Sequence, residues 1–108
     1  MPVIKENSKL WEILIPACSN EGTEYTAKHH QKWEQEAKKI SKGITFLGSA
    51  RGQWKDSRGK NFSEIMIPVR LRGTAEEIRK IGKYTLKHYR QEAVWVYEIS
   101  SNIIEIHK

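Results

Sequence analysis

The stretch from Gly43 to Glu64 constrains the fold most, because it has the pattern of two strands joined by a tight polar turn. Apolar residues alternate at Ile44 and Phe46, which is the period of a β-strand. Residues 55–61 are polar and contain a glycine, Gly59, that can adopt the positive φ of a tight turn. We therefore expect a β-hairpin. The polar or aromatic side chains placed near its tip are Gln53, Trp54 and Glu64.

Two predicted helices flank this hairpin, and each has a recognisable start. Thr26 is a good N-cap for a helix that runs to about Lys42, where Gly43 would end it. A capping box that begins at Thr74 predicts a second helix to about residue 91. Each segment has one apolar stripe at spacings of three and four, which predicts one buried face per helix. The stripes are His30, Trp33, Ala37 and Ile40 in the first helix, and Ile78, Ile81, Thr85 and Tyr89 in the second.

Three further segments alternate with the period of a strand, at residues 9–16, 62–71 and 93–99. Pro68 predicts an outer position or a bulge for the second of them. A short apolar run at residues 103–106 could add a fifth strand. The order strand, helix, strand, strand, helix, strand predicts an α+β, ferredoxin-like split βαβ fold (βαββαβ). Right-handed crossovers then place both helices on one face of an antiparallel sheet of strand order 4-1-3-2.

Length and composition limit the class of protein. A chain of 108 residues is the size of one domain, so we expect residues 1–108 to form a single domain whose segment 1–8 is loose. No apolar run approaches the roughly 20 residues of a membrane-spanning helix. The single Cys18 excludes an internal disulfide and fits a reducing compartment, so a cytoplasmic protein is expected. No phosphate-binding glycine loop is present, and we expect no cofactor.

Several short motifs resemble a family of small bacterial and phage proteins of unknown function. These are Gly43-Ile44-Thr45, Gly52-Gln53-Trp54 and Glu64, together with Trp33, Tyr84, Gln91 and Val94. The resemblance covers residues 26–99 and implies a ferredoxin-like domain. The family has no established activity, so the resemblance assigns no catalytic residue.

The predicted topology brings six side chains from four elements to one end of the molecule. They are His30, Gln53, Trp54, Glu64, His88 and Gln91. Two histidines and a carboxylate are metal ligands in many proteins, and a glutamate beside an imidazole can perform acid–base chemistry. The same groups can also bond to each other and only stabilise the fold. Both interpretations stay open at this point, and no metal is assigned.

Charge and surface composition suggest three function classes. Our main expectation is a homodimeric binding module that acts through a protein or small-ligand partner. The two copies would pair through the outer face of the sheet, because its surplus apolar residues need to be covered. A small enzyme or metal-binding protein that uses His30, Glu64 and His88 is one alternative, so whether the chain is an enzyme is open. The net charge of +6 also permits nucleic-acid binding. The basic residues of the hairpin that would contact phosphates are Arg51, Lys55, Arg58 and Lys60.

Overall fold

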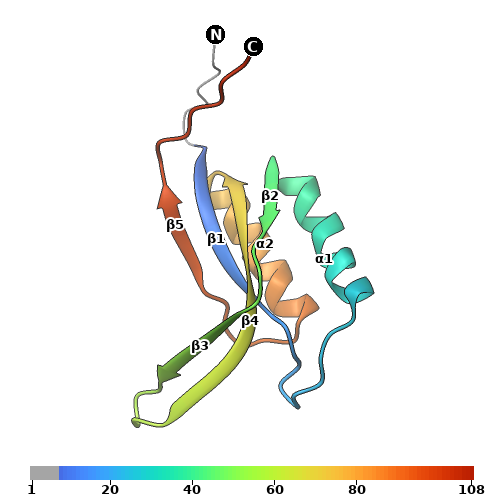
Figure 1. Ribbon diagram of the computed structural model, residues 1–108, viewed down its shortest axis with the longest axis vertical. Coiled ribbons are helices and arrows are strands. Elements are labelled where there is room, and N and C mark those ends of the chain that lie inside the picture. Colours follow the sequence, from blue (N-terminus) through green and yellow to red (C-terminus); the bar gives the residue numbers. More distant parts are fainter. Residues whose placement is uncertain (1–7) are drawn as a thin grey trace.

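The computed structural model describes residues 8–108, and its architecture is the predicted α+β class. Two helices lie on one face of a five-stranded antiparallel sheet (Figure 1). The elements in chain order are β1 (Lys9–Pro16), α1 (Ala27–Ile40), β2 (Gly43–Phe46), β3 (Ala50–Lys55), β4 (Asn61–Gly73), α2 (Ala75–His88) and β5 (Val96–Ser100). The segment expected to be loose, residues 1–8, falls outside the described residues except for Ser8.

The order of the strands agrees with the prediction. The sheet runs β2-β4-β1-β5, and β3 pairs with β4 beyond β2. The sequence predicted one strand before the hairpin turn, and β2 and β3 together occupy its place. When β2 and β3 are counted as one strand, the order is the predicted 4-1-3-2. The expected strand at residues 103–106 is wrong, because these residues have no strand structure. The fifth strand arises instead from the division between β2 and β3.

A bulge causes this division and explains the proline in β4. Phe46 pairs with Val69 and Ala50 with Met66, so the β2–β3 side contains one residue more than the β4 side. Pro68 accepts a hydrogen bond from Leu47 N at 2.9 Å, so its backbone polar atoms face the bulge. The backbone N–H that proline lacks would therefore lie at the bulge, where the hydrogen-bond ladder between the strands is already interrupted. The expected outer position for Pro68 is wrong, since β4 lies between other strands, and the expected bulge is confirmed.

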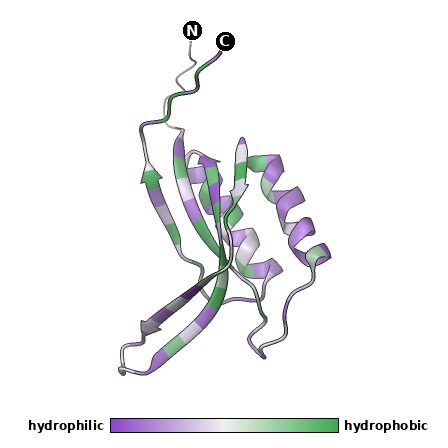
Figure 2. Cartoon of the chain, in the orientation of Figure 1, coloured by the Kyte–Doolittle hydropathy of each residue, from purple (hydrophilic) through white to green (hydrophobic). Residues whose placement is uncertain are grey.

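The core lies between the helices and the sheet. Its fully buried members come from both helices and from β1 and β4: Ile13, Ile15, Trp33, Ala37, Val69, Leu71, Ile78, Ile81 and Tyr89. The indole N–H of Trp33 donates to Thr85 Oγ1 at 2.9 Å, and that hydroxyl donates to the Ile81 carbonyl at 2.6 Å. The buried polar atoms that join the helices are therefore paired, which avoids the cost of a buried donor without an acceptor. Apolar residues recur along β1, β4 and α2, the elements that surround this interior (Figure 2).

The helix ends agree with the sequence only in part. Thr26 caps α1 and Thr74 forms a full capping box with Glu77, as predicted. The first helix ends at Ile40, however, and Ser41 caps it by donating its backbone N–H to the Ala37 carbonyl at 2.8 Å. The expectation that Gly43 ends the helix is wrong, because this residue already pairs with β4. The second helix also ends earlier than predicted, at His88.

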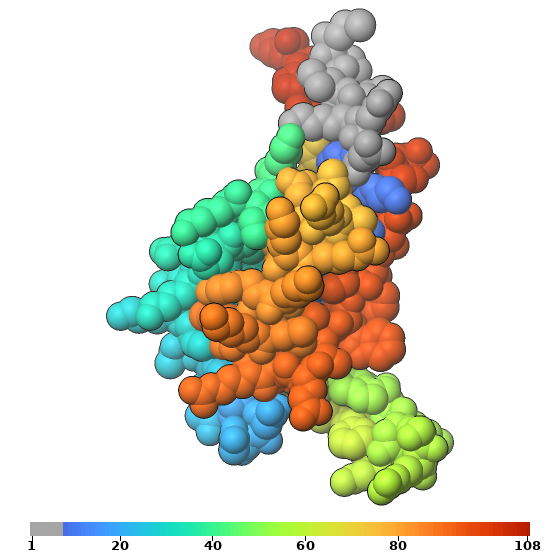
Figure 3. All heavy atoms as spheres, turned by 180° about the vertical axis from the view of Figure 1, so that it is seen from behind, coloured from blue at the N-terminus to red at the C-terminus, as the bar shows by residue number. Residues whose placement is uncertain are grey.

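The β1–α1, β3–β4 and α2–β5 connections lie at one end of the molecule. The end of β1, the start of α1, the end of α2 and the β3–β4 hairpin all lie there, and the hairpin projects past the helices (Figures 1 and 3). Gly59 has φ +80° in the hairpin turn, as expected. Asp56 Oδ1 holds the turn by accepting hydrogen bonds from the N–H groups of Arg58 and Lys60 at 2.8 and 2.9 Å. Among residues 8–108, no helix is long and apolar enough to cross a membrane.

Candidate functional site

The six side chains expected to converge do lie toward this end, but five of them form two groups and Gln53 belongs to neither. Trp54, Glu64 and Gln91 line one pocket. His30 and His88 belong to an aromatic cluster between the helices. Gln53 lines a separate hollow with Trp54 and Trp95. Glu64 therefore does not share a site with the histidines.

The register of the hairpin decides which side chains face the pocket. Phe62, Glu64 and Met66 alternate along β4 and so point to the same side. Gln53 and Glu64, both expected near the hairpin tip, are not cross-strand partners, because Gln53 pairs with Ser63 and Gly52 pairs with Glu64. The turn of residues 56–60 sets this register, and the sequence pattern alone did not fix it.

Gly52 makes room for the pocket wall. A Cβ atom at this position would lie 2.7 Å from Met66 Cε and 3.1 Å from Trp54 Cζ3. Only glycine therefore lets these two side chains close over the backbone of β3 without displacement. The close approach explains why a glycine lies between Arg51 and Gln53 in a segment that otherwise needs strand-forming residues.

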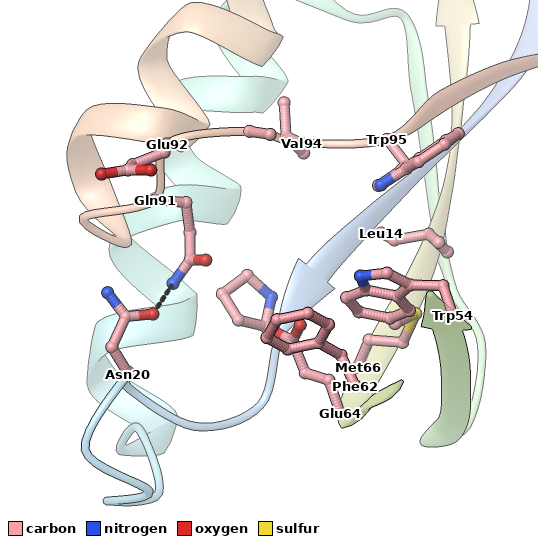
Figure 4. A pocket seen from close by; sticks show the side chains of 12 residues that line it. Leu14, Asn20, Trp54, Phe62, Glu64, Met66, Gln91, Glu92, Val94 and Trp95 are labelled. Carbon is pink, nitrogen blue, oxygen red and sulfur yellow. Dashed lines mark hydrogen bonds between the residues drawn. The ribbon is translucent and has the colours of Figure 1, made fainter. Parts of the chain in front are cut away.

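The pocket has a volume of about 460 Å³ and lies where the α2–β5 connection meets β1 and the hairpin (Figure 4). Three aromatic side chains, Trp54, Phe62 and Trp95, form much of its wall. Its polar side chains are Asn20, Glu64, Gln91 and Glu92. This combination of aromatic surface with a few polar groups is typical of small-molecule sites.

Glu64 is the most unusual of these polar groups. Its side chain is half-buried and makes no hydrogen bond or ion pair with any residue in the range 8–108. Burial raises the pKa of the Glu64 carboxyl above its ordinary value of 4.5. The pocket lining contains two carboxylates and no lysine, arginine or histidine, although the chain has a net charge of +6. A pocket of this charge favours a cationic ligand.

The amides of Gln91 and Asn20 join two loops at the rim of the pocket. Gln91 Nε2 donates to Asn20 Oδ1 at 3.3 Å and to the Tyr89 carbonyl at 3.1 Å. Asn20 Nδ2 in turn donates to the Arg90 carbonyl at 3.3 Å. These bonds hold the β1–α1 loop against the residues that follow α2, as Figure 4 shows for the Asn20–Gln91 pair.

The second group is a stack of four rings across the two helices. Tyr25 stacks on His29 with a centroid distance of 4.7 Å, His29 on His88 at 3.9 Å, and His88 on Tyr84 at 5.4 Å. The buried stripe predicted for the first helix includes His30 but neither Tyr25 nor His29. Neither residue belongs to the three-and-four spacing of that stripe, which is why the pattern missed them.

Reciprocal hydrogen bonds join the two histidines of this stack. His29 Nε2 donates to the His88 carbonyl at 3.0 Å, and His88 Nε2 donates to the His29 carbonyl at 2.7 Å. The Tyr84 hydroxyl lies 3.2 Å from His88 Nδ1 and forms a hydrogen bond with it. Burial, with the His29 ring adding to it, lowers the pKa of both His30 and His88 below 6.5. The cluster therefore has the properties of a structural clamp.

Metal ligation and anion binding were the other expectations for this end. Within the described part of the chain, no group of three or more His, Cys, Asp or Glu side chains could hold a metal ion. The four basic hairpin residues are exposed, and none forms an ion pair with another residue between Ser8 and Lys108. They are Arg51, Lys55, Arg58 and Lys60. Their role in nucleic-acid binding stays a prediction.

Comparison with known proteins identifies relatives by fold. A phage SAM lyase in complex with S-methyl-5′-thioadenosine matches with a TM-score of 0.69 over 98% of this chain and 91% of that chain, at 17% identity. CutA1 from Oryza sativa matches with a TM-score of 0.63 over 94% and 82% of the two chains, at 7% identity. The periplasmic divalent cation tolerance protein CutA from Archaeoglobus fulgidus matches with a TM-score of 0.60 over 89% and 87%, at 8% identity.

The comparisons of sequence add no family. No protein-family model matches the chain, and no curated protein matches it. The resemblance to a family of small bacterial and phage proteins therefore stays a prediction. The fold is the ferredoxin-like α+β fold, with structural similarity to a phage SAM lyase and to CutA proteins.

Proposed function

We propose that this chain is a small enzyme that binds S-adenosylmethionine in the pocket around Glu64 and cleaves it as a SAM lyase. The observation that carries the proposal is the half-buried carboxylate of Glu64, which has no partner within residues 8–108 and is surrounded by aromatic side chains. The fold similarity to a phage SAM lyase supports the same substrate class. Among the expected functions, this favours the small enzyme over the binding module.

The chemistry of the ligand complements the pocket. A sulfonium ion has a positive charge but no N–H group, so it needs a carboxylate and aromatic faces rather than hydrogen-bond acceptors in a fixed geometry. Glu64 supplies the charge, and Trp54, Phe62 and Trp95 supply the faces. The flat adenine ring also stacks well on aromatic side chains. A volume of about 460 Å³ falls within the usual range for a small-molecule pocket.

The reaction follows from the structures of the two compounds. S-methyl-5′-thioadenosine is what remains of S-adenosylmethionine when the bond from sulfur to the aminobutyrate arm breaks. The electron pair of that bond stays on sulfur, which becomes a neutral thioether, while the carboxylate of the aminobutyrate arm attacks the carbon that the sulfur leaves and closes a lactone. Glu64 attracts the charged substrate and not the neutral product, so its role is to bind substrate and favour product release. His30 and His88 contribute stability and do not contact the ligand.

The test is a direct assay of the purified chain. We expect incubation with S-adenosylmethionine to release S-methyl-5′-thioadenosine, detected by chromatography and mass spectrometry. Glu64→Gln keeps the shape of the side chain and removes its charge, and it should raise KM by at least about tenfold. Glu36→Gln is the matched control, because Glu36 is half-exposed on α1 and forms only a surface pair with Lys39. Failure of the unmodified chain to bind or cleave the compound would refute the proposal.

Self-association through the outer sheet face is a second proposal. Trp95, which directly precedes β5, and Tyr97 on β5 are 58% and 41% exposed, and their rings stack with a centroid distance of 6.3 Å. Adjacent exposed aromatic side chains are typical of protein interfaces. A second copy that rests on Tyr97 would also contact Trp95, which lines the pocket. We therefore infer a homodimer whose interface borders the site.

A further inference from the structure

We propose that the side-chain carbonyl of Gln91 selects ligands that present an amino group at its end of the pocket, so that a 6-aminopurine binds and a 6-oxopurine does not. This inference rests on the proposed nucleoside ligand, and it adds a residue that determines which base is accepted. Its structural basis is the fixed orientation of one amide.

Backbone carbonyls determine that orientation in two steps. Asn20 Nδ2 lies 3.3 Å from the Arg90 carbonyl oxygen, which can only accept a hydrogen bond. This contact fixes the orientation of the Asn20 amide, with Oδ1 turned away from Arg90. Asn20 Oδ1 accepts from Gln91 Nε2 at 3.3 Å. The same Nε2 donates to a second oxygen, the Tyr89 carbonyl, at 3.1 Å. Rotating the Gln91 amide by 180° would place oxygen against two oxygens, so the orientation shown is the stable one.

The other atom of the amide is left for a ligand. Gln91 Oε1 makes no hydrogen bond within residues 8–108. Figure 4 shows it on the side of the amide that faces the pocket. An oxygen in this position is an acceptor with an open lone pair, and its partner must be a donor.

The surrounding polar groups support the same preference. The charged side chains that line the pocket, Glu64 and Glu92, are also acceptors when ionised. The indole groups of Trp54 and Trp95 lie on the wall opposite Gln91 (Figure 4). A 6-oxo group beside Gln91 would therefore bring one acceptor against another. Sites built to bond a donor reject an analogue that lacks it far more strongly than an apolar pocket rejects a change in size.

The experiment compares two neutral ligands that differ only in the base: the 6-amino group of one is a 6-oxo group in the other, which also carries a proton on N1. Calorimetry with the full chain would measure the Kd of S-methyl-5′-thioadenosine and of S-methyl-5′-thioinosine. We expect the unmodified protein to bind the adenosine compound at least 10-fold more tightly. Gln91→Leu should reduce the preference below threefold. Asn20→Ala should also reduce it, because only the Tyr89 carbonyl then holds the amide, which can rotate more easily and offer its NH₂ group to the 6-oxo compound.

The outcomes separate this inference from the proposed function. Equal affinities in the unmodified protein, or an unchanged preference in both variants, would overturn the role of Gln91 and leave the proposed function standing. Absence of binding by both compounds and by S-adenosylmethionine would overturn both. Thermal unfolding of each variant is the control for folding. Asn20 is exposed, so its alanine variant supplies the test even if Gln91→Leu does not fold.

Discussion

Replacing His88 by alanine is expected to lower the free energy of unfolding by about 2–4 kcal/mol. The substitution removes the hydrogen bond to the His29 carbonyl at 2.7 Å and the bond from the Tyr84 hydroxyl at 3.2 Å. Each such bond contributes about 0.5–1.5 kcal/mol net. It also removes two stacked ring contacts, which contribute about 0.5 kcal/mol each at the lower end of the range for aromatic pairs.

The same residue should make stability depend on pH. Burial lowers the pKa of His88 and of His30 below 6.5, so the folded chain binds protons less well than the unfolded chain. Stability therefore rises with pH through this region, is fully present above pH 6.5, and falls as the pH drops below 6.5. The nearby charges act in both directions, since Lys32 also lowers the pKa of His88 while Glu24 opposes the lowering at His30.

Chemical denaturation at pH 7.5 and pH 5.5 measures both effects. His88→Phe keeps a ring in the stack and removes the hydrogen bonds and the titration. The decrease that it causes in the stability difference between pH 7.5 and pH 5.5 should therefore exceed the decrease in stability at pH 7.5. His107→Ala is the control, because this ring is exposed and contacts only Glu105. A loss below about 0.5 kcal/mol for His88→Ala, or a wild-type stability that rises on acidification, would refute the reasoning.

Three further predictions concern the pocket, the hairpin and the sheet face. Glu64→Gln should leave the free energy of unfolding at pH 7 unchanged or raise it by up to about 0.5 kcal/mol. Burial raises the pKa of this carboxyl, so its charged form destabilises the fold as the pH rises above 4.5. A loss above about 1 kcal/mol, measured by denaturation, would show that the carboxylate has a stabilising partner in the folded chain. Exchanging the four basic hairpin residues for glutamine should weaken any nucleic-acid binding and flatten its salt dependence, and absence of binding at low salt by the unmodified chain ends that hypothesis. Light scattering at micromolar concentration should give a dimer mass that Tyr97→Lys shifts toward the monomer, whereas a monomer mass for the unmodified chain contradicts the dimer.

The elements and their order were predictable because local chemistry determines them. Thr26 and the Thr74 capping box mark the helix starts, and Gly59 marks the hairpin turn. Right-handed crossovers then give the strand order. These rules also predicted which end of the molecule would carry Glu64, Gln91 and the histidines.

The arrangement within that end was not predictable. Topology places residues at one end of a layer but does not say which face each side chain occupies. The bulge before Ala50 and the turn of residues 56–60 set the hairpin register, which separates Gln53 from Glu64. The pocket also depends on the irregular segments around Asn20 and Gln91, where no periodic pattern exists. The partners of Gln91 could be found only once these loops were placed.

Discrimination of charge tests the proposed site most directly. Calorimetry at pH 7.5 would compare S-adenosylmethionine with S-adenosylhomocysteine, which replaces the sulfonium by a neutral thioether and keeps the rest of the molecule apart from one methyl group. If Glu64 attracts the sulfonium, the unmodified chain should bind the charged compound about tenfold more tightly, equivalent to about 1.4 kcal/mol, and Glu64→Gln should bind the two compounds equally. Equal affinities in the unmodified chain, or a preference that survives Glu64→Gln, would contradict the assignment of this pocket.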